Sequence, residues 1–262
     1  MQTLDEVIGM MDRNTAALKS GQTPNRPFLF IKTPRTASDS MDYEFVHAVR
    51  NYVKIGHAKL VRDFYSRPDD LTISLSHNHT PIAAMRRAGI MPESSYQARF
   101  KFASVRNPWD RLVSFWRLRS CKGTSGSIAK QSSTFADFVN SLPQYLQFNP
   151  YSRHYFQVQP QWRFLQPDYD MILRFEHLQD DWATLTKMLD MNIKLSVRLS
   201  LHGSVSTDRI GYERFYTPQL AQTVRSLYRV DCELFGYESV GCQSPFDSQT
   251  ILGNLKSIWG DA

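Results

Sequence analysis

Residues 100–117 read FKFASVRNPWDRLVSFWR and predict a strand, a sharp turn and a helix in immediate succession. Phe100 to Arg106 is an apolar run of the length of a buried strand. Asn107 is a favoured N-cap residue, and Pro108 is favoured at the first position of a helix. The helix then continues to about Arg119, with an apolar stripe along one side. This stretch therefore predicts one unit of an α/β fold.

The same order of strand, turn and helix recurs elsewhere in the chain. Further strands are expected at Phe28 to Lys32, Leu71 to Ser76 and Met171 to Phe175. Helices are expected from about Met41 to Tyr52, Thr80 to Gly89, Asp180 to Leu189 and Thr217 to Gly236. The alternation predicts an α/β fold with a parallel sheet. We expect a single domain over residues 1–262, with an N-terminal extension over 1–27 and a C-terminal tail over 238–262.

The composition narrows the class of protein. A chain of 262 residues that is 42% hydrophobic can bury a large core, which excludes disorder as its main state. The net charge of +6 favours an anionic ligand, although a basic soluble surface explains it equally well. Three scattered cysteines form neither a disulfide framework nor a zinc pattern, so we expect a reducing compartment.

The sequence contains neither a signal peptide nor an apolar run long enough to span a membrane. We therefore expect a soluble cytoplasmic protein without a membrane partner. The polar stretch from Lys122 to Ser133 is expected to be a surface loop. The sequence does not predict an oligomeric state.

Residues 33–40, TPRTASDS, follow the first expected strand and lead into a helix. Small residues allow a ligand to approach the backbone, while N–H groups at a helix N-terminus favour an anion. The loop lacks the pattern of a Walker A motif. Taken alone, it is also compatible with an ordinary turn between a strand and a helix.

Arg106 ends the strand quoted first, and Ser114 lies about two turns into the following helix. A guanidinium beside a helix N-terminus is well placed to hold a second anion. The Ser114 hydroxyl could reach the same anion or bond to its own backbone. Glu176 and His177, directly after the last strand, are expected to border the same cleft.

These stretches resemble a family. VRNPWDRLVSFWR is similar to the 3′-phosphate motif of sulfotransferases that use 3′-phosphoadenosine 5′-phosphosulfate (PAPS), and TPRTASDS resembles their 5′-phosphosulfate loop. Their separation of about seventy residues resembles the carbohydrate branch of the family. Further similar segments follow in order, at Val158 to Gln161, Ile172 to Glu176, Tyr216 to Leu220 and Leu234 to Tyr237. The resemblance implies a three-layer, P-loop-like fold in which helices flank a central parallel sheet.

The resemblance also implies roles for individual residues. The 5′-phosphosulfate loop would consist of Arg35, Thr36, Ala37, Ser38, Asp39 and Ser40. Arg106 and Ser114 would hold the 3′-phosphate. Arg35 stands where the family has lysine, and Lys32 could supply the missing ammonium. Asp39 departs from the family pattern and either caps the helix or repels the anion.

Two further segments complete the predicted site. His77 and His79 follow the second strand and would face one side, and they resemble the His-x-His of heparan sulfate 2-O-sulfotransferases, which implies a catalytic base. A metal pair is the alternative, but no third ligand is evident, and we predict no metal. Ser204 and Arg209 lie in a stretch that, by the resemblance, folds over the nucleotide in the family. The same residue types are also typical of a solvated loop.

The sequence as a whole predicts a sulfotransferase that moves a sulfuryl group from PAPS to an acceptor hydroxyl, on a saccharide, leaving 3′-phosphoadenosine 5′-phosphate (PAP). His77 or His79 would act as the base, and Arg35 with Lys32 would neutralise developing charge. The alternatives are a non-catalytic protein that binds phosphoadenosine nucleotides and a P-loop-like nucleotide kinase. A nucleic-acid partner is not expected, since no recognition motif is present. The missing membrane anchor favours a bacterial or viral setting, or an excised domain.

Overall fold

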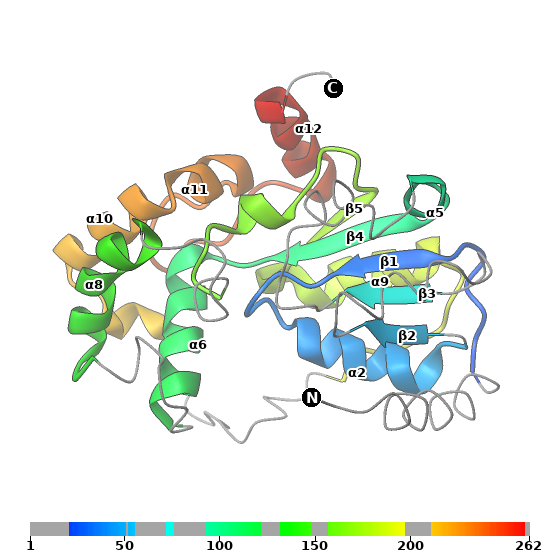
Figure 1. The fold of residues 1–262 in the computed structure, drawn as a ribbon, viewed down its shortest axis with the longest axis horizontal. Coiled ribbons are helices and arrows are strands. Elements are labelled where there is room, and N and C mark those ends of the chain that lie inside the picture. Colours follow the sequence, from blue (N-terminus) through cyan, green and yellow to red (C-terminus); the bar gives the residue numbers. More distant parts are fainter. Residues whose placement is uncertain are drawn as a thin grey trace.

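A parallel β-sheet forms the centre of the molecule (Figure 1). The computed structural model describes residues 21–50, 52–55, 72–75, 93–121, 132–147, 157–196 and 211–259. Within these ranges the strands are β1 (Phe28–Ile31), β2 (Tyr52–Ile55), β3 (Thr72–Leu75), β4 (Phe100–Val105) and β5 (Met171–Arg174). They pair in the order β2-β3-β1-β4-β5, with every pair parallel.

Helices cover both faces of the sheet. They are α2 (Ser38–Ala48), α5 (Glu93–Gln97), α6 (Pro108–Cys121), α8 (Phe135–Gln147), α9 (Leu178–Met188), α10 (Pro218–Leu227), α11 (Arg229–Phe235) and α12 (Ser248–Trp259). Short 3₁₀ helices lie at 161–164, 175–177 and 212–215. In Figure 1, α6, α8, α10 and α11 gather beyond the carboxyl ends of the strands. None of the helices within the described ranges is long and apolar enough for a membrane crossing.

Alternating side chains divide the core into two clusters. Leu29 and Ile31 of β1 face a cluster that includes residues of α6, α8, α10, α11 and α12. Phe28 and Phe30 face the opposite cluster, which includes residues of α2 and α9. Because successive side chains of a strand point to opposite faces, one apolar strand serves both clusters. The α/β fold with three layers is therefore confirmed.

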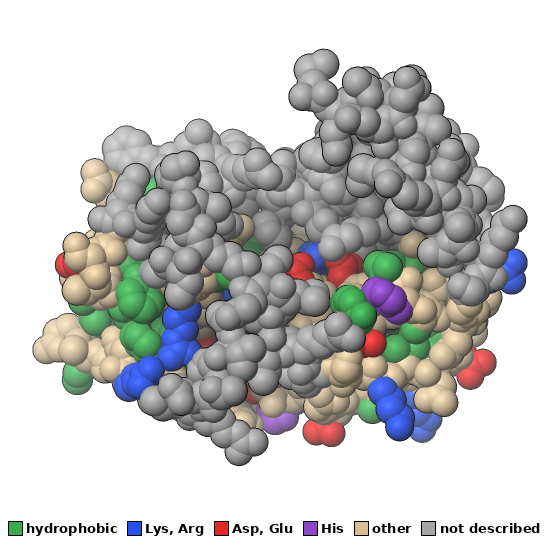
Figure 2. All heavy atoms as spheres, turned by 90° about the horizontal axis from the view of Figure 1, so that it is seen from below, with side chains coloured by type: hydrophobic (Ala, Val, Ile, Leu, Met, Phe, Trp, Pro, Cys, Tyr) green, Lys and Arg blue, Asp and Glu red, His purple; other side chains and the backbone are tan. Residues whose placement is uncertain are grey.

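Charges of both signs mix on the face drawn in Figure 2. Among the described residues visible there, Lys and Arg side chains are interspersed with Asp and Glu side chains. The positive charge of the described residues is thus not gathered into one patch on this face.

The four strands expected from the sequence are confirmed, but two helix predictions are wrong in part. The first helix ends at Ala48, and Tyr52 belongs to β2, because Val49 is already extended and the Tyr52 ring packs against Phe28 and Phe45. The long helix expected over 217–236 breaks at Tyr228 into α10 and α11.

Other details follow the sequence. Thr217 caps α10, and Gly236 ends α11 at a φ of 75°. The expected tail contains α12, whose Ile251, Leu252 and Leu255 are buried in the core. The helix expected at Thr80 to Gly89 and residues 122–131 of the expected loop lie outside the described residues.

Candidate functional site

Two loops leave the sheet side by side at its carboxyl edge. One connects β1 to α2, and the other connects β4 to α6. Strands β1 and β4 are neighbours, with Phe30 opposite Phe102. The chain passes from β1 toward β2 on one side and from β4 toward β5 on the other. In α/β proteins, ligands bind beyond the strand ends at such a change of direction.

The loop after β1 has an unusual backbone. Arg35 and Ala37 have φ values of 65° and 62°, a left-handed conformation that is unfavourable for residues other than glycine. Ala37 is the N-cap of α2 and provides no side-chain cap, while its carbonyl accepts hydrogen bonds from the N–H groups of Ser40 and Met41. The backbone strain thus lies at the start of α2, within the predicted phosphosulfate loop.

The Thr36 side chain ties this loop to β4. Its hydroxyl lies 2.6 Å from the Ser104 hydroxyl and 2.9 Å from the Thr33 carbonyl, to which it donates. Ser104 also donates to the carbonyl of Thr36 at 3.1 Å. Thr36 is completely buried. The Thr36 hydroxyl therefore holds the loop against the sheet, a contact that the sequence did not indicate.

Lys32 is a buried cation held by two carboxylates. Its Nζ lies 2.8 Å from Asp39 and 2.6 Å from Asp42, and Tyr52 donates a further hydrogen bond to Asp42. Burial alone lowers the pKa of the ammonium, but attraction to Asp42 and Asp39 outweighs it, so the pKa is raised. Lys32 is therefore charged, and its charge is balanced within the fold.

Asp39 thus has a partner that the sequence did not indicate. Its side chain is 53% exposed, whereas that of Asp42 is 2% exposed. Ser38 and Asp39 begin α2, and Ser40 completes its first turn. The Asp39 carboxylate lies between the buried Lys32 ammonium and solvent. It therefore occupies the N-terminus of α2, where an anion would bind.

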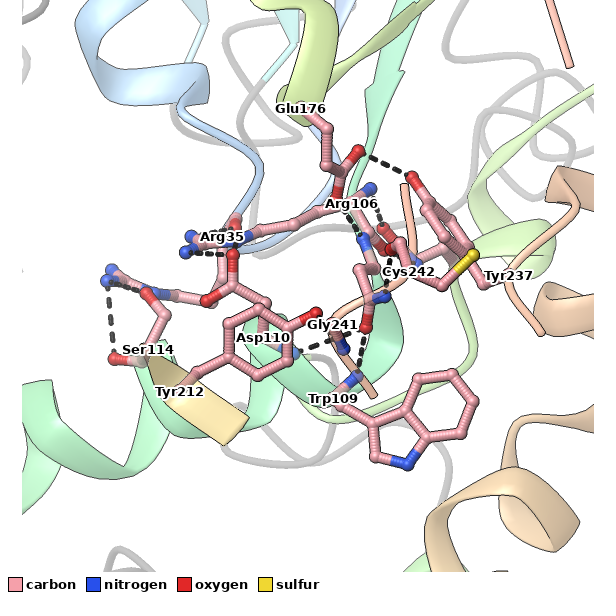
Figure 3. A network of polar contacts seen from close by, with 12 residues as sticks. Arg35, Arg106, Trp109, Asp110, Ser114, Glu176, Tyr212, Tyr237, Gly241 and Cys242 are labelled. Carbon is pink, nitrogen blue, oxygen red and sulfur yellow. Dashed lines mark hydrogen bonds and ion pairs between the residues drawn. The ribbon is translucent and has the colours of Figure 1, made fainter. Parts of the chain in front are cut away.

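The start of α6 is built as the sequence predicted. The Asn107 side-chain oxygen accepts hydrogen bonds from the N–H groups of Trp109 at 3.0 Å and Asp110 at 3.4 Å. Its amide nitrogen donates to the Cys242 carbonyl at 2.8 Å (Figure 3). Asn107 therefore caps α6 and joins it to the segment that follows α11.

The Arg106 guanidinium is fixed on several sides. Its Nε and Nη2 each lie 2.8 Å from Asp110, which is four residues along the same helix. Its Nη1 donates to the Arg35 carbonyl at 3.2 Å, and its Cζ lies 3.8 Å from the centre of the Phe175 ring. These contacts fix the orientation of the guanidinium at the carboxyl edge of the sheet.

Arg35 and Ser114 connect the two predicted halves of the site. The Arg35 Nη2 donates to the Ser114 hydroxyl at 2.9 Å, so a side chain from the β1 loop reaches α6. In Figure 3, Arg35 of the loop after β1 and Arg106 of the loop after β4 lie close to Ser114 of α6. The structure therefore brings together the residues expected at the two phosphates, although the direct bond between Arg35 and Ser114 was not predicted.

Two carboxylates, Glu176 and Asp110, flank the turn from Val105 to Asp110 between β4 and the start of α6, which we call the Arg106 corner. Glu176 accepts hydrogen bonds from the Asn107 N–H at 2.6 Å and the Tyr237 hydroxyl at 2.8 Å, and burial raises the pKa of Glu176. The sequence placed Glu176 at the cleft but gave no indication of these partners. Asp110 was missed, although an acid four residues after an arginine on a helix is a recognisable pairing signal.

Four predicted site residues lie outside the described residues: His77, His79, Ser204 and Arg209. The described half of the site therefore contains the β1 loop and the Arg106 corner. Its three cations are Lys32, Arg35 and Arg106, and Asp39, Asp42 and Asp110 pair with two of them.

Comparison with known proteins identifies the family. A model described as the sulfotransferase family matches residues 22–238, so the chain belongs to this family. Among solved structures, the chain is similar to the crystal structure of a sulfotransferase from Alicyclobacillus acidocaldarius, with 12% sequence identity and a TM-score of 0.48. That match covers 89% of this chain and 95% of the other. No curated protein matches the chain.

Proposed function

We propose that the protein transfers a sulfuryl group from PAPS to a hydroxyl group and that the acceptor is a saccharide. The observation that carries this proposal is the convergence of Arg35, Arg106 and Ser114 beyond the carboxyl ends of β1 and β4, in a chain of the sulfotransferase family. Two anchored guanidinium groups beside two helix N-termini suit a ligand with two separate phosphate groups.

Each part of the nucleotide has candidate residues. Arg35 and the start of α2, from Ala37 to Ser40, would hold the 5′-phosphosulfate, with Thr36 contributing only its backbone. Arg106 and Ser114 would hold the 3′-phosphate. Ser204 and Arg209 would cover the nucleotide, as the resemblance implies. PAPS would supply the sulfuryl group and leave as PAP.

The acceptor hydroxyl needs a base, and positive charge must stabilise the departing oxygen. We assign the base to His79 or His77. Arg35 would neutralise the developing charge directly. Lys32 would have to leave one of its carboxylate partners to do the same, because Asp39 and Asp42 hold its ammonium.

The proposal is tested by incubating the protein with PAPS and a panel of saccharides and small hydroxyl compounds. We expect a sulfated saccharide and an equal amount of PAP. Binding of PAP without any product would instead favour the non-catalytic nucleotide-binding protein. Competition by ATP together with a phosphorylated product would favour the kinase.

The base is tested with the double variant His77→Ala and His79→Ala. We expect kcat to fall by about 10² to 10⁴ while PAP affinity stays nearly unchanged, since a base acts in the transition state. His47→Ala is the control, because this exposed histidine at the end of α2 stacks only on Tyr43 among the described rings. Full turnover by the double variant would overturn the assignment.

A further inference from the structure

The peptide group of Arg106 is held by a glutamine side chain from a distant part of the chain. The Gln161 Oε1 accepts a hydrogen bond from the Arg106 N–H at 2.9 Å, and its Nε2 donates to the Arg106 carbonyl at 2.8 Å. The last residue of β4 that pairs with β5 is Val105. Gln161 therefore continues the pairing of β4 one residue beyond the sheet, with a side-chain amide in place of a strand.

Gln161 is itself anchored. It is completely buried, and Asp231 of α11 accepts hydrogen bonds from the N–H groups of Gln161 at 2.8 Å and Trp162 at 2.9 Å. Asp231 is also fully buried. Because this carboxylate fixes the backbone of Gln161, the amide side chain has a defined direction toward Arg106.

The next peptide group is held from the end of β5. Glu176 accepts a hydrogen bond from the Asn107 N–H at 2.6 Å, and its other oxygen accepts one from Tyr237 at 2.8 Å. The preceding residue, Phe175, presents its ring to the Arg106 guanidinium. Residues of the 3₁₀ helices at 161–164 and 175–177 thus hold the peptide groups of Arg106 and Asn107.

We propose that Gln161 and Glu176 are positioning residues for Arg106, which they prepare to receive the 3′-phosphate of the nucleotide; this inference rests on the proposed function. Gln161 and Glu176 fix the peptide groups from which the Arg106 side chain extends, while Asp110 and Phe175 hold its guanidinium. Ordering a long side chain at the moment of binding weakens affinity, and a backbone and guanidinium that are fixed beforehand avoid that loss. These hydrogen bonds surround one arginine. Their loss should therefore weaken binding of the 3′-phosphate far more than binding of the 5′-phosphate.

The test compares the affinities of PAP and AMP, which differ by the 3′-phosphate. Gln161→Met removes both hydrogen bonds to Arg106 at similar volume, and we expect PAP affinity to fall about 5- to 10-fold, with less than about a 2-fold change for AMP. Gln166→Met is the matched control, because Gln166 is also buried in this segment but donates to the carbonyl of its neighbour Leu165. It should leave the PAP to AMP ratio unchanged.

Glu176 provides an independent pair of variants. Glu176→Gln keeps an oxygen that can accept from the Asn107 N–H and should retain the preference for PAP, whereas Glu176→Leu should lose it. This pair decides the question if Gln161→Met does not fold. Equal weakening of PAP and AMP, or equal effects of Gln161→Met and Gln166→Met, would overturn the inference.

Arg106→Ala separates this inference from the proposed function. If Arg106→Ala still prefers PAP to AMP, the assignment of the 3′-phosphate to Arg106 fails. If Arg106→Ala abolishes the preference while Gln161→Met and Glu176→Leu preserve it, the assignment stands and the positioning role alone is wrong.

Discussion

The two helices whose N-termini border the site begin in different ways. Helix α6 starts with Asn107 as a side-chain cap and Pro108 at the first helical position. Helix α2 starts at Ala37, which has a left-handed backbone and no side-chain cap. A capped N-terminus is stable without a ligand, whereas an uncapped one leaves its N–H groups to other partners.

The two cations Arg106 and Lys32, which lie near these helix N-termini, also differ in how they are held. The Arg106 guanidinium is held by Asp110 and by the Phe175 ring, and a hydrogen-bonded frame fixes its backbone. Lys32 is held by two carboxylates, one of them half exposed. The comparison teaches that both cations are paired with carboxylates, but that the backbone of Arg106 is also held by a hydrogen-bonded frame, whereas one carboxylate partner of Lys32 is half exposed at the N-terminus of α2. The following experiments change the residues of one of these two parts of the site at a time.

The largest effect is expected from Arg106→Ala, and it concerns the stabilisation of the protein by bound nucleotide. In the wild-type protein, PAP should raise the melting temperature more than AMP does, because two phosphates meet two sites. Removing the guanidinium should abolish most of that difference, at roughly 1.5 to 3 kcal/mol for a hydrogen bond to a charged group. Arg117→Ala is the control, since this residue of α6 packs against Phe215. Equal shifts by PAP and AMP in the wild type would disprove the role of Arg106.

The two helix starts should respond with opposite signs. Asn107→Ala removes the cap of α6 and should lower the free energy of unfolding by about 1 to 2 kcal/mol. Ala37→Gly relieves the left-handed backbone and should raise it by about 0.5 to 1 kcal/mol. Urea unfolding measures both changes. Destabilisation by both substitutions would show that Ala37 is not strained.

The sequence predicted the Arg106 corner because its signals are local. An apolar run, a cap residue and a proline within ten positions define β4, the turn and the start of α6. The end of α2 could not be predicted in this way. Tyr52 lies in β2 because its ring packs on Phe28 and its hydroxyl bonds to Asp42, and neither contact is encoded in the helical pattern.

The partners of the site residues were also beyond local reasoning. Gln161 and Glu176 lie 55 and 69 residues from their hydrogen-bond partners at Arg106 and Asn107. Whether such side chains meet depends on the strand order, which no local signal determines. The pairing of Lys32 with Asp39 spans only seven residues, but it depends on the unusual loop backbone between them.

A smaller effect on stability is expected from Glu176, and it depends on pH. Burial raises the pKa of this carboxyl, so the folded protein keeps its proton to a higher pH than the unfolded chain. Stability should therefore fall as the pH rises from the ordinary pKa of glutamate to the raised value. Glu176→Gln removes this contribution. Urea midpoints from about pH 4 to about pH 7 should show the wild type losing stability relative to the variant, and a constant difference would contradict the prediction.

The smallest effect on stability is expected from Asp39→Asn, which tests the other corner. Asp39 is half exposed, so its ion pair with Lys32 should contribute about 1 kcal/mol or less to the free energy of unfolding. Asp42→Asn is the matched comparison on the same ammonium, and it should destabilise more because Asp42 is buried.

Asp39→Asn should increase nucleotide affinity although it lowers the free energy of unfolding. Removal of the Asp39 charge beside the N-terminus of α2 should tighten PAP and AMP alike, by about 5-fold or less, since both ligands carry a 5′-phosphate. The gain should shrink as salt is added, because exposed charges are screened. Weaker binding of both nucleotides by Asp39→Asn would mean that the carboxylate orients Lys32 for the ligand and does not compete with it. The β1 loop would then be organised in advance, as the Arg106 corner is.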